Sequence, residues 1–301
     1  MKFAAIDIGS NAIRLLFCNV FEVNNIITFK KISLIRVPLR LGTDVFNTGE
    51  ISSKNSKRLL KTMFAFKNLI DVHDDVISYR ACATSAMRDA KNGAELVAQI
   101  KELTDIQIEI VTGDKEADII SANHIEDHLD ATKNYLYIDV GGGSTELTFI
   151  ENKKVVASHS FNVGTIRLLQ SNGLTPVYEE MKLWIKKNVH PGEDGLQAIG
   201  SGGNINKIAS MIAKKESKPL HLDDILSNYN LLISYTFEER VRLLGLNEDR
   251  ADVILPASEI FINVMHYAHI KKIIVPKIGV VDGIVHMLYE EYKAKLTPTF
   301  N

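Results

Sequence analysis

The sequence predicts an α/β protein with two domains, and three observations carry this prediction. The chain of 301 residues is long enough for two domains of ordinary size. Short apolar runs end in turns that contain Gly or Asp and alternate with helical patterns, which is typical of sheets covered by helices. One strand–turn–strand pattern also occurs twice, about one domain length apart.

The periodicity and the turn residues place the elements in order. Ser52 and Ser53 precede apolar residues at helical spacing, which predicts a capped amphipathic helix over about 53–71. The further expected elements are a strand over 76–83, a cap at Thr84 and Ser85 before a helix from 86, a strand over 106–110, a helix opening at 112–114, a strand over 196–199 leading into glycines and a helix, a strand over 273–275, and a last helix to about 295.

The repeat sets the expected domain boundaries. Asp7 and Asp139 each end an apolar run, are followed by a glycine turn, and lie 132 positions apart. This spacing predicts a duplicated unit with two lobes, lobe I over 1–122 and lobe II over 123–287, around a cleft that the two turns face. The C-terminal helix, over about 288–301, is expected to return to lobe I.

Composition and charge exclude several classes of protein. The chain has 46% hydrophobic residues and a net charge of −2, so it is neither disordered nor fibrous, and no chain-wide positive field would collect nucleic acid or an anionic membrane. Cys18 and Cys82 do not form a disulfide scaffold or a zinc cluster, and are expected as buried thiols. With no apolar segment long enough to span a membrane and no signal peptide before Asp7, we expect a cytoplasmic protein.

Each glycine turn could bind phosphate. Glycines allow successive backbone N–H groups to converge on an anion, and an Asp at the strand end can hold Mg²⁺ beside it. A single such turn is more often an ordinary hairpin, but its repetition favours phosphate binding. The sequence has neither the phosphate loop of nucleotide hydrolases nor the dinucleotide fingerprint, so phosphate chemistry here needs a different scaffold.

At this point a set of ordered motifs resembles a known family, that of exopolyphosphatases and guanosine pentaphosphate phosphohydrolases (Ppx/GppA), in its short two-domain form. The motifs are Asp7–Asn11, Ala83–Ala90, Gly113–Ala117, Asp139–Leu147, Val163–Leu168, Gly200–Asn204 and Glu248–Asp252. The resemblance implies a duplicated actin-like, sugar-kinase-like (ribonuclease H-like) fold. It also implies removal of a terminal phosphate by water, assisted by Mg²⁺ or by Mn²⁺.

The resemblance also implies roles for individual residues. Glu116 corresponds to the catalytic base, and the Glu that usually precedes it is replaced by Lys115, which removes a negative charge beside the base. Asp139 and Glu146 are expected to carry the metal, with Asp7 as a weaker third candidate. The expected phosphate-binding residues are Ser10, Asn11, Arg88, Gly141, Gly142, Gly143, Ser144 and Thr145. Arg14, Arg167 and Lys207 are weaker candidates.

Other suggestive patterns have simpler interpretations. His124 and His128 have a metal-binding spacing but lack the rest of a zinc motif, so solvent-facing histidines are expected. The dyad His73–Asp74 lacks the partner residues of a metal hydrolase. Trp184 lies on a helix with several lysines, and packing explains this helix better than nucleic-acid binding does.

The function expected from the resemblance is release of orthophosphate from the end of inorganic polyphosphate. Removal of the 5′-phosphate of pppGpp is the alternative on the same site. Val281 stands where the family often has Arg, which makes extended phosphate binding less secure. An ATP-dependent small-molecule kinase and a non-catalytic actin-like protein are the alternatives of other classes. No nucleic acid or membrane is an expected partner, and a homodimer is possible.

Overall fold

The computed structural model describes the whole chain except residues 25, 125–128, 171–174, 213–218 and 297–301. Its contacts divide the chain into two units, which we describe separately. The first unit contains residues 1–123 and 279–301, and the second contains residues 124–278. The C-terminal helix therefore belongs with the amino-terminal half of the chain.

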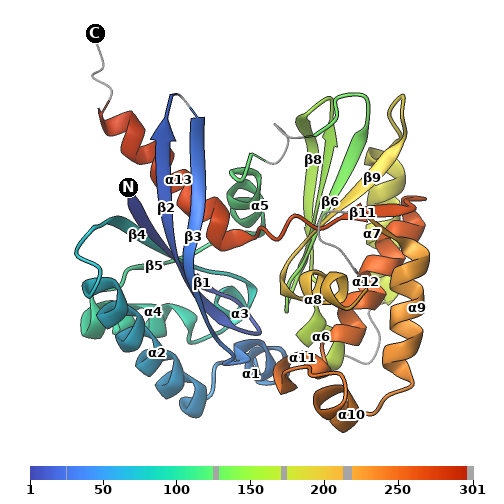
Figure 1. The fold of residues 1–301 in the computed structure, drawn as a ribbon. Helices are drawn as coiled ribbons and strands as arrows, with labels where there is room; N and C mark the ends of the chain where they lie inside the picture. Colours follow the sequence, from blue (N-terminus) through green and yellow to red (C-terminus); the bar gives the residue numbers. More distant parts are fainter. Residues whose placement is uncertain (25, 125–128, 171–174, 213–218, 297–301) are drawn as a thin grey trace. The chain divides into compact units, whose positions relative to one another are not determined.

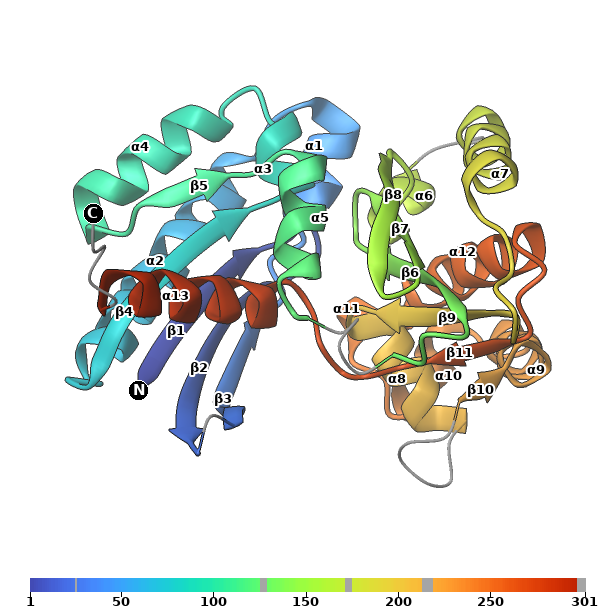
Figure 2. The ribbon, with the colours of Figure 1, turned by 90° about the horizontal axis from the view of Figure 1, so that it is seen from above.

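The first unit is a sheet covered by helices on both faces (Figures 1 and 2). Its strand order is β3-β2-β1-β4-β5, in which β1, β2 and β3 are antiparallel and β4 and β5 run parallel to β1. The strands are β1 (Lys2–Ile8), β2 (Ile13–Val23), β3 (Ile26–Val37), β4 (Val76–Ala83) and β5 (Ile108–Ile110). The helices are α1 (Leu41–Thr48), α2 (Ser53–Asp71), α3 (Ser85–Asp89), α4 (Gly93–Thr104), α5 (Gly113–Ser121) and α13 (Val280–Leu296).

Two apolar clusters form the core of this unit, one on each face of the sheet. Ala4, Ile6 and Ile8 of β1 pack with the buried side chains of α1–α4. Phe3 and Ala5 point to the other face, where α5 and α13 lie. This alternation along β1 is the period of two that a strand imposes, and it makes β1 the centre of a three-layer arrangement.

The second unit repeats the topology of the first. Its strand order is β10-β11-β9-β6-β7-β8, so that β8-β7-β6-β9-β11 corresponds to β3-β2-β1-β4-β5. The strands are β6 (Asn134–Val140), β7 (Thr145–Glu151), β8 (Lys154–Phe161), β9 (Leu196–Ser201), β10 (Leu220–His221) and β11 (Lys272–Ile274). The helices are α6 (Thr165–Gln170), α7 (Thr175–Asn188), α8 (Gly203–Ile212), α9 (Leu222–Ile233), α10 (Phe237–Arg242), α11 (Glu248–Ala251) and α12 (Ile254–Tyr267). The predicted duplicated α/β fold is confirmed.

Local sequence signals account for several of these elements. The helix predicted over 53–71 is α2, and the Ser52 side chain accepts a hydrogen bond from the backbone N–H of Asn55. The strand predicted over 76–83 is β4. Thr112 caps α5 by accepting a hydrogen bond from the backbone N–H of Lys115 at 3.2 Å.

The C-terminal helix α13 begins at Val280, earlier than the expected start near residue 288. Its beginning is fixed by Asp282, whose carboxylate accepts a hydrogen bond from the Gly279 N–H at 2.9 Å and pairs with Lys31 at 2.8 Å. Burial raises the pKa of Asp282, which Lys31 partly opposes. The helix packs on β1 and on α5.

Both cysteines are buried under this helix, in the cluster that contains Phe3 and Ala5. Burial raises the pKa of Cys18 to about 11 and that of Cys82 to about 12, so both stay protonated and unreactive at neutral pH. In the part of the chain that the structure describes, no helix is both long and apolar enough to cross a bilayer.

The contact between α13 and α5 depends on Gly283. A Cβ atom at this position would lie 1.8 Å from the Ile119 carbonyl oxygen of α5, so any larger residue would push the two helices apart. We expect Gly283→Ala to lower the free energy of unfolding by about 1–3 kcal/mol, the usual cost of overpacking. Urea unfolding measures this change. Gly279→Ala is the control, because a Cβ there meets nothing within 4 Å, and an equal loss in both variants would contradict the explanation.

Candidate functional site

The two glycine turns have the same length and the same hydrogen bond. In the first, the Gly9 N–H donates to the Ala12 carbonyl at 3.2 Å, and in the second the Gly141 N–H donates to the Ser144 carbonyl at 3.0 Å. A Cβ on either glycine would lie 3.1 Å from that same carbonyl oxygen, so both turns favour glycine at this position. The sequence repeat is therefore also a repeat of backbone geometry.

The carbonyl groups of the second turn are held by the start of α6. The N–H groups of Thr165 and Ile166 donate to the carbonyls of Gly141 and Gly142 at 3.0 and 2.8 Å. Arg167 donates its Nε–H to the Gly143 carbonyl at 2.8 Å. All described peptide bonds are trans, so each C=O points opposite to the N–H of the next residue. The amides of residues 142–144 therefore point away from α6 and together can bind an anion.

The first turn is held in the same way. The Gly42 N–H of α1 donates to the Ser10 carbonyl at 2.8 Å, and the Arg40 N–H donates to the Asn11 carbonyl at 2.9 Å. The amides of Asn11 and Ala12 consequently point to the opposite side. The Ser10 hydroxyl forms a buried hydrogen bond at 2.8 Å with the Ser85 hydroxyl of α3, which ties the turn to the end of β4.

The carboxylates of Asp139 and Glu146 are direct cross-strand neighbours beside the second turn. These residues are only 8% and 2% exposed, and Ser160 Oγ donates to Glu146 Oε1 at 2.8 Å. Two buried carboxylates side by side are costly unless a cation shares them. Mg²⁺ binds through one or two carboxylates, with water and phosphate oxygens completing its shell, so these donors fit it. The described residues contain no cluster of three or more His, Cys, Asp or Glu, which a closed metal site would need.

Glu116 lies on the first turn of α5 and is 7% exposed. Arg88 of α3 approaches it, with Nη1 at 3.9 Å from Glu116 Oε2, and donates from the same nitrogen to the Val111 carbonyl at 2.9 Å. Arg88 Nε is also 3.8 Å from the Asp89 carboxylate, a longer contact than a hydrogen bond. Thus a buried carboxylate and a half-buried guanidinium meet where β4 and β5 end. Lys115 is directed elsewhere, 3.4 Å from exposed Glu109.

The model of the Ppx/GppA phosphatase family matches residues 20–291 of the chain. The chain belongs to this family. Its members are phosphatases that act on phosphoanhydride bonds.

Individual relatives have several names. The chain is 31% identical over 285 residues to the bifunctional 3-dehydroquinate synthase/phosphatase of Fusobacterium nucleatum, covering 88% of this chain and 43% of that protein. The chain thus spans less than half of the length of this relative. It is 26% identical to exopolyphosphatase 2 of Mycobacterium tuberculosis, over 94% of this chain and 97% of the relative.

Solved structures of the family share the fold. The Aquifex aeolicus family member aligns with a TM-score of 0.75 at 24% identity, over 97% of this chain and 98% of its own. An exopolyphosphatase from Cytophaga hutchinsonii aligns with a TM-score of 0.80 at 22% identity, with the same coverage of both chains.

Several expected ligands of this Ppx/GppA protein have other contacts. Thr145 is fully buried and its hydroxyl donates to the Val163 carbonyl at 2.6 Å, so that proton is already used within the fold. Arg167 binds the Gly143 carbonyl and so shapes the turn. Asp7 forms an ion pair with Arg14, its cross-strand neighbour, and a cation at Asp7 would have to compete with that guanidinium. Thr84 occupies the N-cap position of α3 but makes no side-chain capping bond.

The remaining candidates have packing roles or lie outside the site. The His73 ring packs on Phe17 with 4.4 Å between the ring centroids, and Trp184 packs edge-on against Phe161 with 6.0 Å between the ring centroids. His124 is described and belongs to no metal cluster among the described residues, whereas His128 lies outside them.

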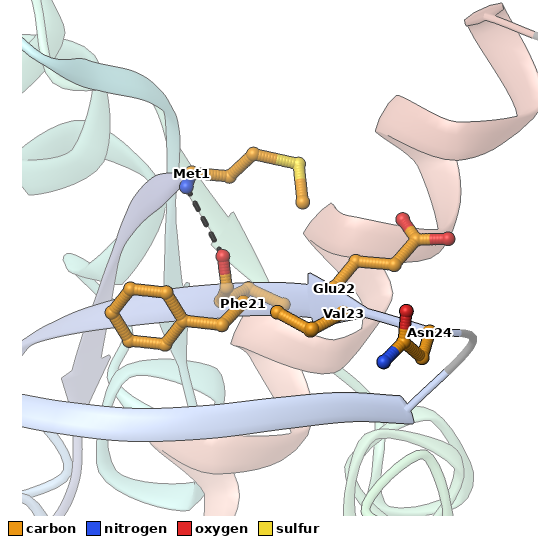
Figure 3. A pocket seen from close by; sticks show the side chains of 6 residues that line it. Met1, Phe21, Glu22, Val23 and Asn24 are labelled. Atoms are coloured by element: carbon orange, nitrogen blue, oxygen red, sulfur yellow. Dashed lines mark hydrogen bonds between the residues drawn. The ribbon is translucent and has the colours of Figure 1, made fainter.

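Hollows lined by described residues occur in both units. One, of about 300 Å³, lies in the second unit and is lined by Gly203, Asn206, Lys207, Gly245, Asn247 and Arg250. Arg250 Nη1 donates to the Gly203 carbonyl there. The other, of about 590 Å³, is an open hollow beside Met1 and the end of β2 remote from the glycine turn (Figure 3). Its carboxylate, Glu22, is paired with Lys293, so it offers no evident catalytic group.

Sequence reasoning missed Ser85, Ser160 and Gly202 as parts of the site. A Cβ at Gly202, which has φ +101°, would lie 3.1 Å from Asp139 Oδ1. Ser160 is found only by strand register, because it faces Glu146 across β7 and β8. Ser85 was expected only as part of a helix cap. Its hydrogen bond with Ser10 could have been predicted, because the two residues follow the neighbouring parallel strands β4 and β1.

The shape of the second turn depends on Gly164. A Cβ there would lie 2.5 Å from the Gly143 nitrogen, so Gly164→Ala should move the turn and its amides. We expect a loss of about 1–3 kcal/mol in unfolding free energy and weaker binding of inorganic phosphate. Urea unfolding and calorimetric titration measure the two effects. Asn162→Ala, an exposed change in the same loop, is the control. Unchanged phosphate binding in Gly164→Ala would show that the turn is not an anion site.

Proposed function

We propose that this protein releases terminal orthophosphate from inorganic polyphosphate by attack of water, with Glu116 as the general base. The observation that carries the proposal is the pair of glycine turns whose carbonyls accept hydrogen bonds from the segment after the third strand of each unit, so that the amides of the same peptide groups point away from that segment. Family membership and the M. tuberculosis relative named exopolyphosphatase 2 support the same chemistry.

Hydrolysis of a phosphoanhydride requires an oriented water molecule, neutralisation of the negative charge on the phosphoryl group, and a general base that accepts a proton from the water. In our proposal the water oxygen attacks the terminal phosphorus, the bond to the bridging oxygen breaks, and the shortened chain leaves with that oxygen. Glu116 accepts the proton of the water. Arg88, whose Nη1 lies 3.9 Å from Glu116 Oε2, places a positive charge beside the carboxylate and binds a phosphate oxygen.

The metal is part of the same proposal. Asp139 and Glu146 would hold Mg²⁺, with Mn²⁺ as an alternative, and the bound ion would supply charge neutralisation on the phosphoryl group. The amides of residues 142–144, together with the Ser144 hydroxyl, bind phosphate oxygens, as do Ser10 and the Asn11 amide in the first unit. The 2% exposure of Ser10 and Ser144 indicates that these hydroxyls are positioned by the fold.

Hydrolysis of pppGpp at the same site is the second candidate, and the hollow of about 300 Å³ favours it. Lys207 and Arg250 provide positive charge there, and Asn206 Oδ1 is buried with no hydrogen-bond partner among the described residues. An amide oxygen in such a hollow is suited to accept a hydrogen bond from a nucleobase. No comparable observation favours a kinase or a filament-forming protein.

Glu116→Gln should lower turnover about 10²-fold or more, because an amide cannot accept the proton. Phosphate release from polyphosphate measures turnover, and thermal unfolding checks that the variant is folded. Asp118→Asn is the matched control, since Asp118 is an exposed carboxylate on the same helix. If Glu116→Gln retains near-normal turnover, Glu116 is not the base.

Asp139→Asn should increase the Mg²⁺ concentration needed for half-maximal turnover, about tenfold or more, because one of two shared charges is removed. The measurement is a Mg²⁺ titration of phosphate release. Glu151→Gln, at the other end of the segment Thr145–Glu151, removes the same charge away from the turn and serves as control. If Asp139→Asn needs the same Mg²⁺ concentration for half-maximal turnover as the wild type, Asp139 does not bind the metal.

The substrate is decided by comparing phosphate release from polyphosphates of several lengths, pppGpp and ATP, without an added acceptor. Release from polyphosphate at the highest kcat/KM supports our proposal, and preference for pppGpp supports the second candidate. Release that needs an acceptor would reveal a kinase instead.

A further inference from the structure

Two serines of strand β8 lie on the same face of the second-unit sheet. Ser158 faces Thr148 and Ser160 faces Glu146 across the antiparallel strands β7 and β8. Because residues two apart on a strand point to the same face, both hydroxyls lie on the face that carries the Glu146 carboxylate. The two serines differ in the group that each hydroxyl meets.

The Ser158 hydroxyl meets neutral groups. It lies 3.0 Å from Thr148 Oγ1 and donates to the Leu147 carbonyl at 3.4 Å. Ser160 Oγ instead donates to the carboxylate oxygen Glu146 Oε1 at 2.8 Å. A hydrogen bond to a charged acceptor is stronger than one between neutral groups. Ser160 therefore restrains its partner more firmly than Ser158 does.

Glu146 lies on the strand between Asp139 and Ser160. The strand order β6-β7-β8 puts Asp139 on one side of Glu146 and Ser160 on the other. The hydrogen bond from Ser160 therefore engages one carboxylate oxygen from the side opposite Asp139. It restrains Glu146 without coming between the two acids.

The hydroxyl on the other side of the acidic pair has a different partner. Ser201 of β9 aligns with Asp139, but its Oγ donates to the Ile278 carbonyl at 3.0 Å. A hydroxyl has a single proton to donate, so this bond uses the proton of Ser201 within the fold. Of the two serines that flank the acidic pair, Ser160 is the one that donates to a carboxylate.

Restraint of a glutamate matters for binding a cation. A Glu side chain has several rotatable bonds, and fixing them costs conformational entropy. A hydrogen bond that is already present in the fold removes part of this cost, because the ligand is ordered before the cation arrives. Mg²⁺ is demanding in this respect, since it requires near-ideal octahedral geometry. Holding Glu146 in place should therefore increase the affinity for Mg²⁺.

We propose that Ser160 is a positioning residue for the divalent cation. By holding Glu146 Oε1 it orders the carboxylate that shares the cation with Asp139. Ser160 acts only through Glu146, and contacts neither the cation nor the substrate. The inference rests on the metal site of the proposed function.

A buried carboxylate also needs hydrogen-bond donors merely for stability. This structural role predicts that Ser160→Ala lowers the free energy of unfolding but leaves the cation affinity of the folded protein unchanged. Ser158→Ala is the matched control, because it removes a hydroxyl from the same face of the same strand without touching a carboxylate. Ser160→Thr keeps the hydroxyl and suits a strand, so it tests rescue.

The first experiment measures binding of Mn²⁺, which is followed by the loss of the electron paramagnetic resonance signal of free Mn²⁺. It is made with and without orthophosphate and requires no turnover. We expect Ser160→Ala to raise the Mn²⁺ dissociation constant about tenfold, as for loss of a residue that orients a metal ligand. Ser158→Ala should match the wild type, and Ser160→Thr should regain most of the affinity. If urea unfolding shows that Ser160→Ala is not folded, Ser160→Cys, which has a weak donor, replaces it.

The second experiment is a Mg²⁺ titration of phosphate release. Ser160→Ala should need about tenfold more Mg²⁺ for half-maximal turnover, and its kcat should return to nearly the wild-type value at saturating Mg²⁺, because Ser160 does not contact the substrate. A kcat that is lowered at every Mg²⁺ concentration, with an unchanged Mg²⁺ requirement, would overturn the positioning role.

The Mn²⁺ titration keeps this inference separate from the proposed hydrolysis. Weaker Mn²⁺ binding by Ser160→Ala supports the positioning role even if the wild type releases no phosphate, in which case only the hydrolysis fails. Equal binding by Ser160→Ala and the wild type, equal losses in Ser160→Ala and Ser158→Ala, or no binding by the wild type would each reject the positioning role. These three results leave Glu116 as the general base to its own test.

Discussion

The orientation of a few peptide groups is the constraint on which the rest of the site depends. In each unit, the segment after the third strand donates backbone N–H groups to the carbonyls of the glycine turn. Satisfying these carbonyls fixes the turn and at the same time directs its amides outward, because each peptide plane has two opposed ends. A turn held in this way has its amides oriented before any ligand arrives, which would lower the entropic cost of binding an anion.

The same framework has diverged in charge between the two units. The positions beside the first turn hold Arg14 and Asp7, and those beside the second hold Glu146 and Asp139. Because the backbone geometry is repeated, the charge beside each turn depends only on which side chains stand at these two strand positions. Substitutions at a few register positions are therefore sufficient to change the charge beside a turn while its backbone geometry is kept.

Local patterns predicted much of the fold. Ser52 with the apolar spacing after it defined α2, and the repeat of Asp-x-Gly turns identified both central hairpins. Contacts between distant strands were not predictable in this way. The alignment of Arg36 with Arg14 follows a register shift in the pairing of β2 and β3 between Phe17 and Cys18, which no pattern in the sequence indicates. The early start of α13 depends on the ion pair of Asp282 with Lys31, residues far apart in the chain.

The two buried thiols make this chain convenient for spectroscopy. Cys18 and Cys82 are 2% and 0% exposed, and both have pKa values far above neutrality, so maleimide reagents would react with them slowly. A cysteine introduced at an exposed position would therefore accept a fluorescent or spin label without replacement of either native residue. One such label on each unit would allow the distance between the two units to be measured in solution.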